Sequence, residues 1–177
     1  MSAKLVISLL IYLTSATSLL AAVYQEPDAF LAEVFSGEVP DPKVIWLTGD
    51  RKKISSDILG HRYSSLRIRY WQLGNRTAWI LEEIGKDLPI TIGFVIEDGR
   101  MQQTRVLIFR ESRGWEIRHP FFTDQFDQAQ LNAEQQLDRT IDGISGATLS
   151  VRAMKKLAAL SLYLDQQARL QDVSSPP

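Results

Sequence analysis

Apolar and polar residues alternate in the middle of the chain, and this pattern predicts an antiparallel sheet. Within residues 65–73, Arg67 and Arg69 alternate with an apolar set, which is typical of a strand with one buried and one solvated face: Leu66, Ile68 and Tyr70. The chain turns at Gly74-Asn75, and residues 76–84 return as the second strand. We therefore expect a hairpin in which the arginines face solvent rather than a ligand.

A second hairpin is indicated by a tight turn between two β-rich segments. Residues 89–97 and 101–111 are rich in β-branched and aromatic residues, and Asp98-Gly99 lies between them. An Asp-Gly pair in this position is a strong signal for a two-residue hairpin turn, because both central residues need a positive φ.

Apolar residues at helical spacing predict helices on either side of these hairpins. Residues 26–35 place Asp28 as a cap before an apolar set at helical spacing, namely Phe30, Leu31, Val34 and Phe35. Residues 151–170 form an amphipathic helix, with one apolar stripe made of Val151, Met154, Ala158 and Ser161, and leucines beside it. The glutamine-rich residues 127–138 are also expected to be helical.

The remaining segments are shorter. Residues 44–47 are a strand candidate, and the polar residues 49–63 are expected to be irregular with at most a helical turn. Together these elements predict an α+β fold, in which an antiparallel sheet of hairpins packs against helices and an amphipathic helix ends the chain.

Composition limits the class of protein. The chain has 177 residues, of which 45% are hydrophobic and 23% charged, as in an ordinary single globular domain. Its net charge of −1 gives no basic surface, so no nucleic acid is expected as a partner. Cysteine is absent, which excludes disulfides, thiol catalysis and iron–sulfur clusters.

The N-terminus resembles a targeting segment. Lys4 is the only charged residue before Glu26, residues 5–13 are apolar, and small residues follow near Ala16 or Ala21-Ala22. This order is typical of a secretory signal peptide. An uncleaved membrane anchor and a buried N-terminal helix are the alternatives. We expect export to the periplasm or to the outer face of the cytoplasmic membrane.

The residues with the most distinctive chemistry precede the last helix. The run Asp142-Gly143-Ile144-Ser145-Gly146-Ala147-Thr148 combines two glycines, two hydroxyls and a carboxylate. Glycines let the backbone approach a ligand closely, and the N-terminus of a helix favours an anion. A simpler interpretation is that Thr148 or Ser150 caps the helix and Asp142 ends a strand.

The longer pattern, Asp-x-x-Ser-Gly-Ala-Thr after Ile141 and before Leu149-Ser150, resembles the flavinylation motif of the FMN-binding domain family. That family includes the flavin-carrying subunits of the Rnf complex and of the sodium-translocating NADH:quinone reductase. The resemblance implies an FMN bound covalently through a phosphoester to Thr148, which a flavin transferase would attach. Four other residues fill the remaining fixed positions of the motif: Asp142, Ser145, Gly146 and Ala147.

A second segment is similar to the same family. Residues 111–115 resemble its Glu-Thr-Pro-Gly loop near the isoalloxazine ring, which implies cofactor contacts from Glu111, Gly114 and Trp115. The loop departs from the family pattern at Arg113 and Glu116. The resemblance covers about residues 60–165, so we divide the chain into a signal peptide or anchor (1–23), an extension (24–59), an FMN-binding domain (60–170) and a disordered tail (171–177).

Other residues are candidates for supporting roles. Trp115, Phe121 and Phe122 could form a flat platform for the flavin or pack in the core, and Arg152 or Lys155 could assist the phosphate. His119 could hydrogen-bond the ring or stabilise its loop, and His61 has no assigned role. No metal site is predicted.

Three functions are compatible with this sequence. The first is an electron carrier with covalent FMN, which would serve a membrane or periplasmic redox partner. The second is a flavin-dependent reductase of a small substrate, although the chain has no Gly-x-Gly-x-x-Gly run for a dinucleotide. The third is a non-redox exported binding domain that has lost the flavin.

Overall fold

The computed structural model describes residues 21–174 and has an antiparallel sheet of six strands at its centre. Two long hairpins form the middle of the sheet, and one short strand extends it at each edge, in the spatial order β1-β6-β5-β4-β3-β2. In chain order the strands are β1 (Ala22–Val23), β2 (Lys43–Trp46), β3 (Arg67–Leu73), β4 (Arg76–Ile84), β5 (Pro89–Glu97) and β6 (Arg100–Phe109). The predicted α+β fold with antiparallel hairpins is therefore confirmed.

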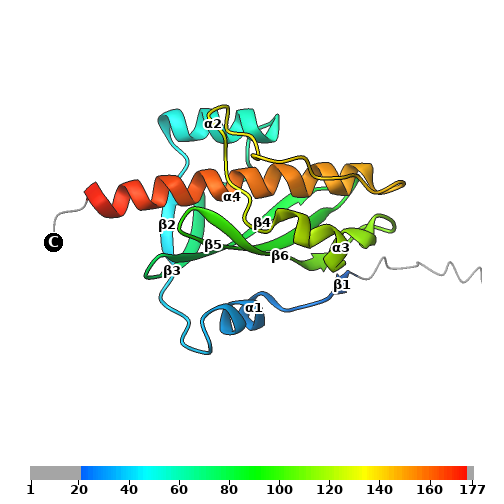
Figure 1. The fold of residues 1–177 in the computed structure, drawn as a ribbon, viewed down its shortest axis with the longest axis horizontal. Coiled ribbons are helices and arrows are strands. Elements are labelled where there is room, and N and C mark those ends of the chain that lie inside the picture. The colour runs from blue at the N-terminus through cyan, green and yellow to red at the C-terminus, as the bar shows by residue number, and fades with distance from the viewer. Residues whose placement is uncertain (1–20, 175–177) are drawn as a thin grey trace, which may run out of the picture.

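Helices cover both faces of the sheet (Figure 1). The long C-terminal helix α4 (Thr148–Ser174) crosses one face, and α2 (Gly49–Leu59) lies on the outer side of α4. On the opposite face lies α1 (Pro27–Val34). Three short helical segments follow β6: η1 (Trp115–Arg118), α3 (Pro120–Thr123) and η2 (Asp124–Phe126).

Each face of the sheet has its own apolar core. The larger core lies under α4 and includes the fully buried Trp79, Phe94 and Leu157. The smaller core lies under α1, where Phe30 and Leu31 pack on Val95. The close approach of α1 explains a glycine in the middle of β5, because a Cβ at Gly93 would lie 2.6 Å from the Phe30 ring.

The hairpin turns form at the predicted residues. Asp98 and Gly99 both have positive φ, 52° and 74°, as a tight two-residue turn requires. In β3, Ile68 and Tyr70 are buried while Arg67 and Arg69 are exposed, in agreement with the predicted alternation. Leu66 was predicted to belong to the buried set, but it precedes β3 and is 53% exposed.

Two predictions about helices were wrong. The polar residues 49–63, expected to be irregular, contain the complete helix α2, which ends at Gly60 with a φ of 75°. The side chain of Lys156 donates a hydrogen bond to the carbonyl of Leu59, and so links the C-terminus of α2 to α4. Ile54 and Ile58 pack against the larger core. Their spacing of four residues is typical of a helix, and it was the sequence pattern that indicated α2.

The glutamine-rich residues 127–138 are not helical. Leu131 and Leu137 form an isolated antiparallel bridge, and Gln135 lies between them with a φ of 60°. The side chain of Asn132 accepts hydrogen bonds from the N–H groups of Glu134 and Gln136, at 3.0 and 2.9 Å. These side-chain bonds to the backbone stabilise a turn instead of a helix. The number of helix-favouring glutamines in the segment does not reveal this effect.

The first helix was predicted correctly, but its cap was not. Glu26 precedes α1, Pro27 is its first residue, and Asp28 lies in the first turn. Pro is well suited to the first helical position because it has no N–H to satisfy there.

Residues 24–59, expected to be an extension, contribute both β2 and α2 to the fold, and Ile45 and Leu59 belong to its larger core. The predicted leader lies almost entirely outside the described residues. Within residues 21–174, no helix is long and apolar enough to span a membrane.

Candidate functional site

The motif that precedes α4 forms a tight turn followed directly by the helix. The N–H of Ala147 donates a hydrogen bond to the carbonyl of Ile144 at 3.0 Å, so residues 144–147 make a β-turn. Gly146 has a φ of 83°, which favours glycine in this position. A Cβ on Gly143 or Gly146 would meet no atom within 4 Å, so the space beside the motif is open.

Thr148 is the first residue of α4, and its side chain is exposed. Ala147 precedes it and accepts the first helical hydrogen bond, from the N–H of Val151 at 2.9 Å. The prediction that Thr148 or Ser150 caps the helix was wrong, because the capping position belongs to Ala147, whose methyl group cannot accept a hydrogen bond.

The start of α4 therefore offers donors to a ligand. The N–H groups in the first turn of a helix have no acceptor within the helix, and the helix dipole adds a partial positive charge there. Within residues 21–174, no side chain accepts a hydrogen bond from the N–H of Thr148, Leu149 or Ser150. This geometry suits a phosphate group attached to the Thr148 hydroxyl.

The predicted cofactor loop contacts the motif through Gly114. This glycine has a φ of 88°, and a Cβ on it would lie 2.5 Å from the Ser150 hydroxyl and 3.5 Å from the Ala147 methyl. Gly114 is thus required for both its backbone conformation and its close contact with α4. The structure brings together Gly114 and Ala147, which are 33 residues apart in the sequence but adjacent in space.

Glu111 has a different environment from Gly114. One oxygen of its carboxylate accepts hydrogen bonds from three consecutive N–H groups, those of Lys86, Asp87 and Leu88, at 2.6, 2.6 and 2.8 Å. Partial burial raises the pKa of Glu111, but these three bonds together outweigh it and hold the pKa below its ordinary value. Its carboxylate therefore fixes the turn between β4 and β5.

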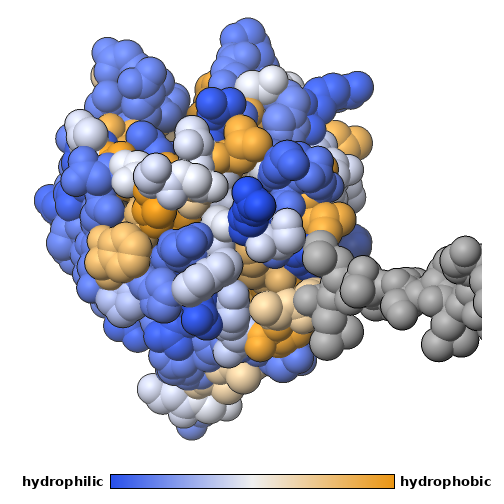
Figure 2. All heavy atoms as spheres, turned by 90° about the vertical axis from the view of Figure 1, so that its right-hand side faces the viewer, coloured by the Kyte–Doolittle hydropathy of each residue, from blue (hydrophilic) through white to orange (hydrophobic). Residues whose placement is uncertain are grey.

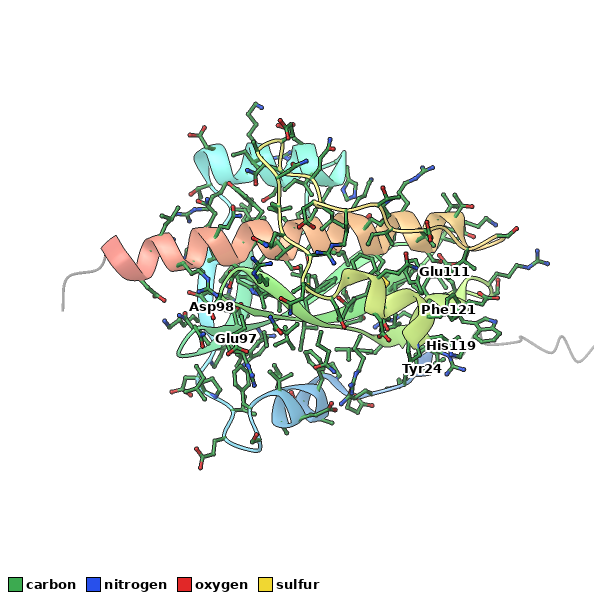
Figure 3. All side chains as sticks on the ribbon, viewed as in Figure 1. Tyr24, Glu97, Asp98, Glu111, His119 and Phe121 are labelled. Carbon is green, nitrogen blue, oxygen red and sulfur yellow. The ribbon has the colours of Figure 1, made fainter. Side chains whose placement is uncertain are left out.

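Trp115 belongs to an exposed cluster that also contains Tyr24, Arg118, His119 and Phe121. The rings of Trp115 and His119 meet edge to face at 5.5 Å, and His119 stacks on Phe121 at 6.1 Å. The Arg118 guanidinium lies 4.4 Å from the centre of the Tyr24 ring and 5.3 Å from that of Trp115. Figure 3 shows Tyr24, His119, Phe121 and Glu111 at the same end of the molecule.

Two of the predicted platform residues are available to a ligand and one is not. Trp115 and Phe121 are 43% and 63% exposed, whereas Phe122 is fully buried against Phe126. Phe122 is therefore a core residue. The sequence reasoning did not single out Tyr24 or Arg118, because neither belongs to a motif and only the fold brings them to Trp115.

The other predicted site residues lie around the motif. Asp142 is exposed, and its N–H donates to the side-chain oxygen of Gln125 at 2.7 Å. Arg152 is exposed and Lys155 half-buried, on the first turns of α4. His61 lies elsewhere, where its ring contacts the Arg62 carbonyl and the Glu83 carboxylate, each at 2.9 Å, and both interactions raise its pKa.

One buried atom near the loop has no partner. The Oε2 atom of Glu116, in the first turn of η1, is buried and makes no hydrogen bond within the described residues. This oxygen is enclosed by the protein itself, so it is not exposed to a ligand in this structure. The open space beside Gly146 and the exposed rings of Trp115 and Phe121 fit a ligand that has an anionic end and a flat ring.

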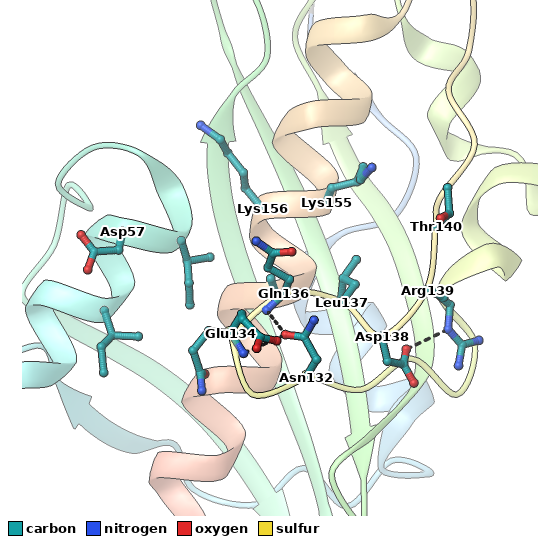
Figure 4. Close-up of a pocket in the computed structure, with 14 residues that line it drawn as sticks. Asp57, Asn132, Glu134, Gln136, Leu137, Asp138, Arg139, Thr140, Lys155 and Lys156 are labelled. Carbon is teal, nitrogen blue, oxygen red and sulfur yellow. Dashed lines mark hydrogen bonds and ion pairs between the residues drawn. The ribbon is translucent and has the colours of Figure 1, made fainter.

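A polar hollow lies farther along α4, away from the motif. It has a volume of about 870 Å³ and is bounded by α2, the 132–140 segment and the middle of α4 (Figure 4). Its lining is mostly polar, including Asn132, Gln136, Lys155 and Lys156. None of the motif residues 142–148 lines this groove.

Comparison with known proteins identifies the part of the chain that contains the motif. Neither the curated proteins nor the solved structures gave a match to this chain. A family model described as an FMN-binding domain matches residues 85–162, from the turn before β5 to the middle of α4. The matched residues include both the Glu111 to Trp115 loop and the Thr148 motif. Residues 85–162 are therefore similar to the FMN-binding domain family, and this similarity supports FMN as the cofactor.

Proposed function

We propose that this protein is an exported flavoprotein that carries FMN through a phosphoester to Thr148 and transfers electrons between redox partners. The observation that carries the proposal is the position of Thr148. Its hydroxyl is exposed on the first residue of α4, beside N–H groups that have no acceptor within the helix. A phosphoester at this point gains favourable interactions with the helix dipole.

The neighbouring loop supports the same proposal. Gly114 holds the loop against Ala147 and Ser150. The next residue, Trp115, has an exposed ring and is therefore close to the motif. Trp115 and Phe121 offer the flat apolar surface that an isoalloxazine ring needs. The flavin itself supplies the redox chemistry when it is bound.

The sequence supports the export and carrier parts of the proposal. Only Lys4 is charged among residues 1–25, as in a signal peptide or anchor, and a covalent bond prevents loss of FMN outside the cytoplasm. Maturation requires a flavin transferase, and the electron partner is a membrane or periplasmic protein. The chain has no Gly-x-Gly-x-x-Gly run that would bind a dinucleotide, which favours a carrier over a reductase.

Two matched threonine variants test the proposal. The chain is exported in a host that contains a flavin transferase, purified, and denatured. We expect flavin absorbance to remain with the wild-type chain and with Thr140→Val, and to be absent from Thr148→Val. Both threonines are exposed, so neither change should disturb the core.

A colourless wild-type protein in that host would contradict the proposal and favour a binding domain without flavin. Covalent flavin that persists in Thr148→Val would place the attachment at another residue. Steady-state turnover with small electron acceptors separates a carrier from a reductase.

A further inference from the structure

We propose that the end of the molecule formed by β1, η1 and the start of α4 lies against a phospholipid surface. The first observation is a gathering of exposed apolar side chains at this end. They come from three segments that are distant in the sequence: Val23 and Tyr24, Trp115 and Phe121, and Leu149. Figure 2 views this end, where orange apolar side chains lie between blue polar ones.

The second observation is the point at which the N-terminal segment enters the fold. β1 begins at Ala22 and pairs with the end of β6, and Ala22 lies opposite Phe109. Residues 1–20 contain a single charge, at Lys4, and are mostly apolar. Tyr24 follows Leu20 by four residues, which span at most about 14 Å. A leader that stays in the bilayer would therefore hold this end, and not another, at the membrane surface.

The third observation is the chemistry of the surface. Trp and Tyr are the residues that favour the boundary between lipid and water, and arginine favours lipid phosphates. The Arg118 guanidinium lies between the rings of Tyr24 and Trp115, at 4.4 and 5.3 Å from their centres. Arg113, two residues before Trp115, is exposed, and neither arginine forms an ion pair within the described residues.

The opposite edge of the sheet supplies an internal comparison. Trp46 ends β2 and is 53% exposed, similar to Trp115, but it lies five strands away from β1. At about 4.8 Å for each strand, the two edges are about 24 Å apart. A bilayer that contacts the β1 end should therefore contact Trp115 and not Trp46.

This inference goes beyond the proposed function, because it concerns the chain before any flavin is attached. The test uses the full-length chain, made by cell-free synthesis without a flavin transferase in the presence of phospholipid vesicles. Some vesicles carry bromine on the acyl chains, which quenches tryptophan fluorescence at short range. The measurements are made on the wild-type chain, Trp115→Phe and Trp46→Phe.

We expect brominated vesicles to quench the wild-type chain and Trp46→Phe equally, and Trp115→Phe to lose most of this quenching. Unchanged quenching in Trp115→Phe would overturn the proposal, since another face would then contact the lipid. Absence of quenching in the wild-type chain would overturn it as well, and would leave this face to solvent or to a protein partner. Equal partial losses in the two variants would show that no face is preferred.

Discussion

The two ends of α4 use polar residues in opposite ways. Near the C-terminal end, Asp165 is completely buried and accepts hydrogen bonds from the Thr77 hydroxyl at 2.6 Å and from Arg169 at 2.8 Å. The indole N–H of Trp79 donates to the same Thr77 hydroxyl at 2.9 Å. At the N-terminal end, Thr148 is exposed and its side chain makes no hydrogen bond within the described residues.

Under the proposed function, the C-terminal half of α4 serves stability and its N-terminal end serves flavin attachment. At the Asp165 end the buried carboxylate is satisfied by Thr77 and Arg169, so the helix is fixed to β4. At the Thr148 end the backbone donors and the hydroxyl are left for a ligand. We therefore expect substitutions at one end to change the free energy of unfolding and those at the other to change flavin attachment.

The largest effect on stability is expected at the buried carboxylate. Asp165→Ala leaves the Thr77 hydroxyl and the Arg169 guanidinium without their acceptor, and should lower the free energy of unfolding by about 3 kcal/mol. Urea denaturation measures the change. The control is Asp142→Ala, an exposed carboxylate at the other end of α4, where we expect a change of no more than about 0.5 kcal/mol. Equal effects of the two variants would contradict the comparison.

A smaller effect distinguishes the two glycines that lie at or beside the motif. Gly114 and Gly146 both have positive φ, but only Gly114 is crowded, by the Ser150 hydroxyl. Gly114→Ala should lower the free energy of unfolding by about 2 kcal/mol, and Gly146→Ala by about 1 kcal/mol. Adding Ser150→Ala to Gly114→Ala should recover part of the loss, because it removes the atom 2.5 Å away. Purely additive effects in this double-mutant cycle would show that the loop and the motif are not in contact.

The smallest expected effect depends on pH. The pKa of Glu111 is below its ordinary value of 4.5, since its hydrogen bonds from three N–H groups outweigh the effect of burial. A carboxylate with a lowered pKa in the folded state stabilises the protein above its unfolded pKa and loses that contribution as the pH falls through its folded pKa. Glu111→Gln should therefore cost about 1 kcal/mol at pH 7, after allowance for screening by solvent.

The pH dependence supplies the check on Glu111. The difference between Glu111→Gln and the wild-type chain should shrink as the pH falls below 4.5. Thermal unfolding across this range measures it. A difference that stays constant would mean that the charge of Glu111 does not hold the turn between β4 and β5.

The sheet was largely predictable because its signals are local. The alternation in β3 and the Asp98-Gly99 turn each act within a few residues, and both hairpins formed as expected. The helix α2 and the turn at Asn132 were missed for the opposite reason. Their stability depends on contacts with α4 and on a side chain that bonds to the backbone, and neither effect is visible in average composition.

The place of the motif in the fold was predictable because the motif is one continuous segment. The sequence placed Thr148 just before the last helix, and in the structure it is the first residue of that helix. It did not indicate that Ala147 would precede the helix without a capping side chain, or that the Glu111 carboxylate would bond to the turn at Lys86 to Leu88. The contact between Tyr24 and Arg118 joins segments about ninety residues apart, so only the folded chain reveals it.

The most direct test of the account is the mass of the peptide that contains Thr148, taken from protein matured in a host that exports it and supplies a flavin transferase. We expect this peptide to carry the added mass of one FMN joined as a phosphoester, and fragmentation to assign it to Thr148. An unmodified peptide, or a flavin located on another residue, would contradict the central claim.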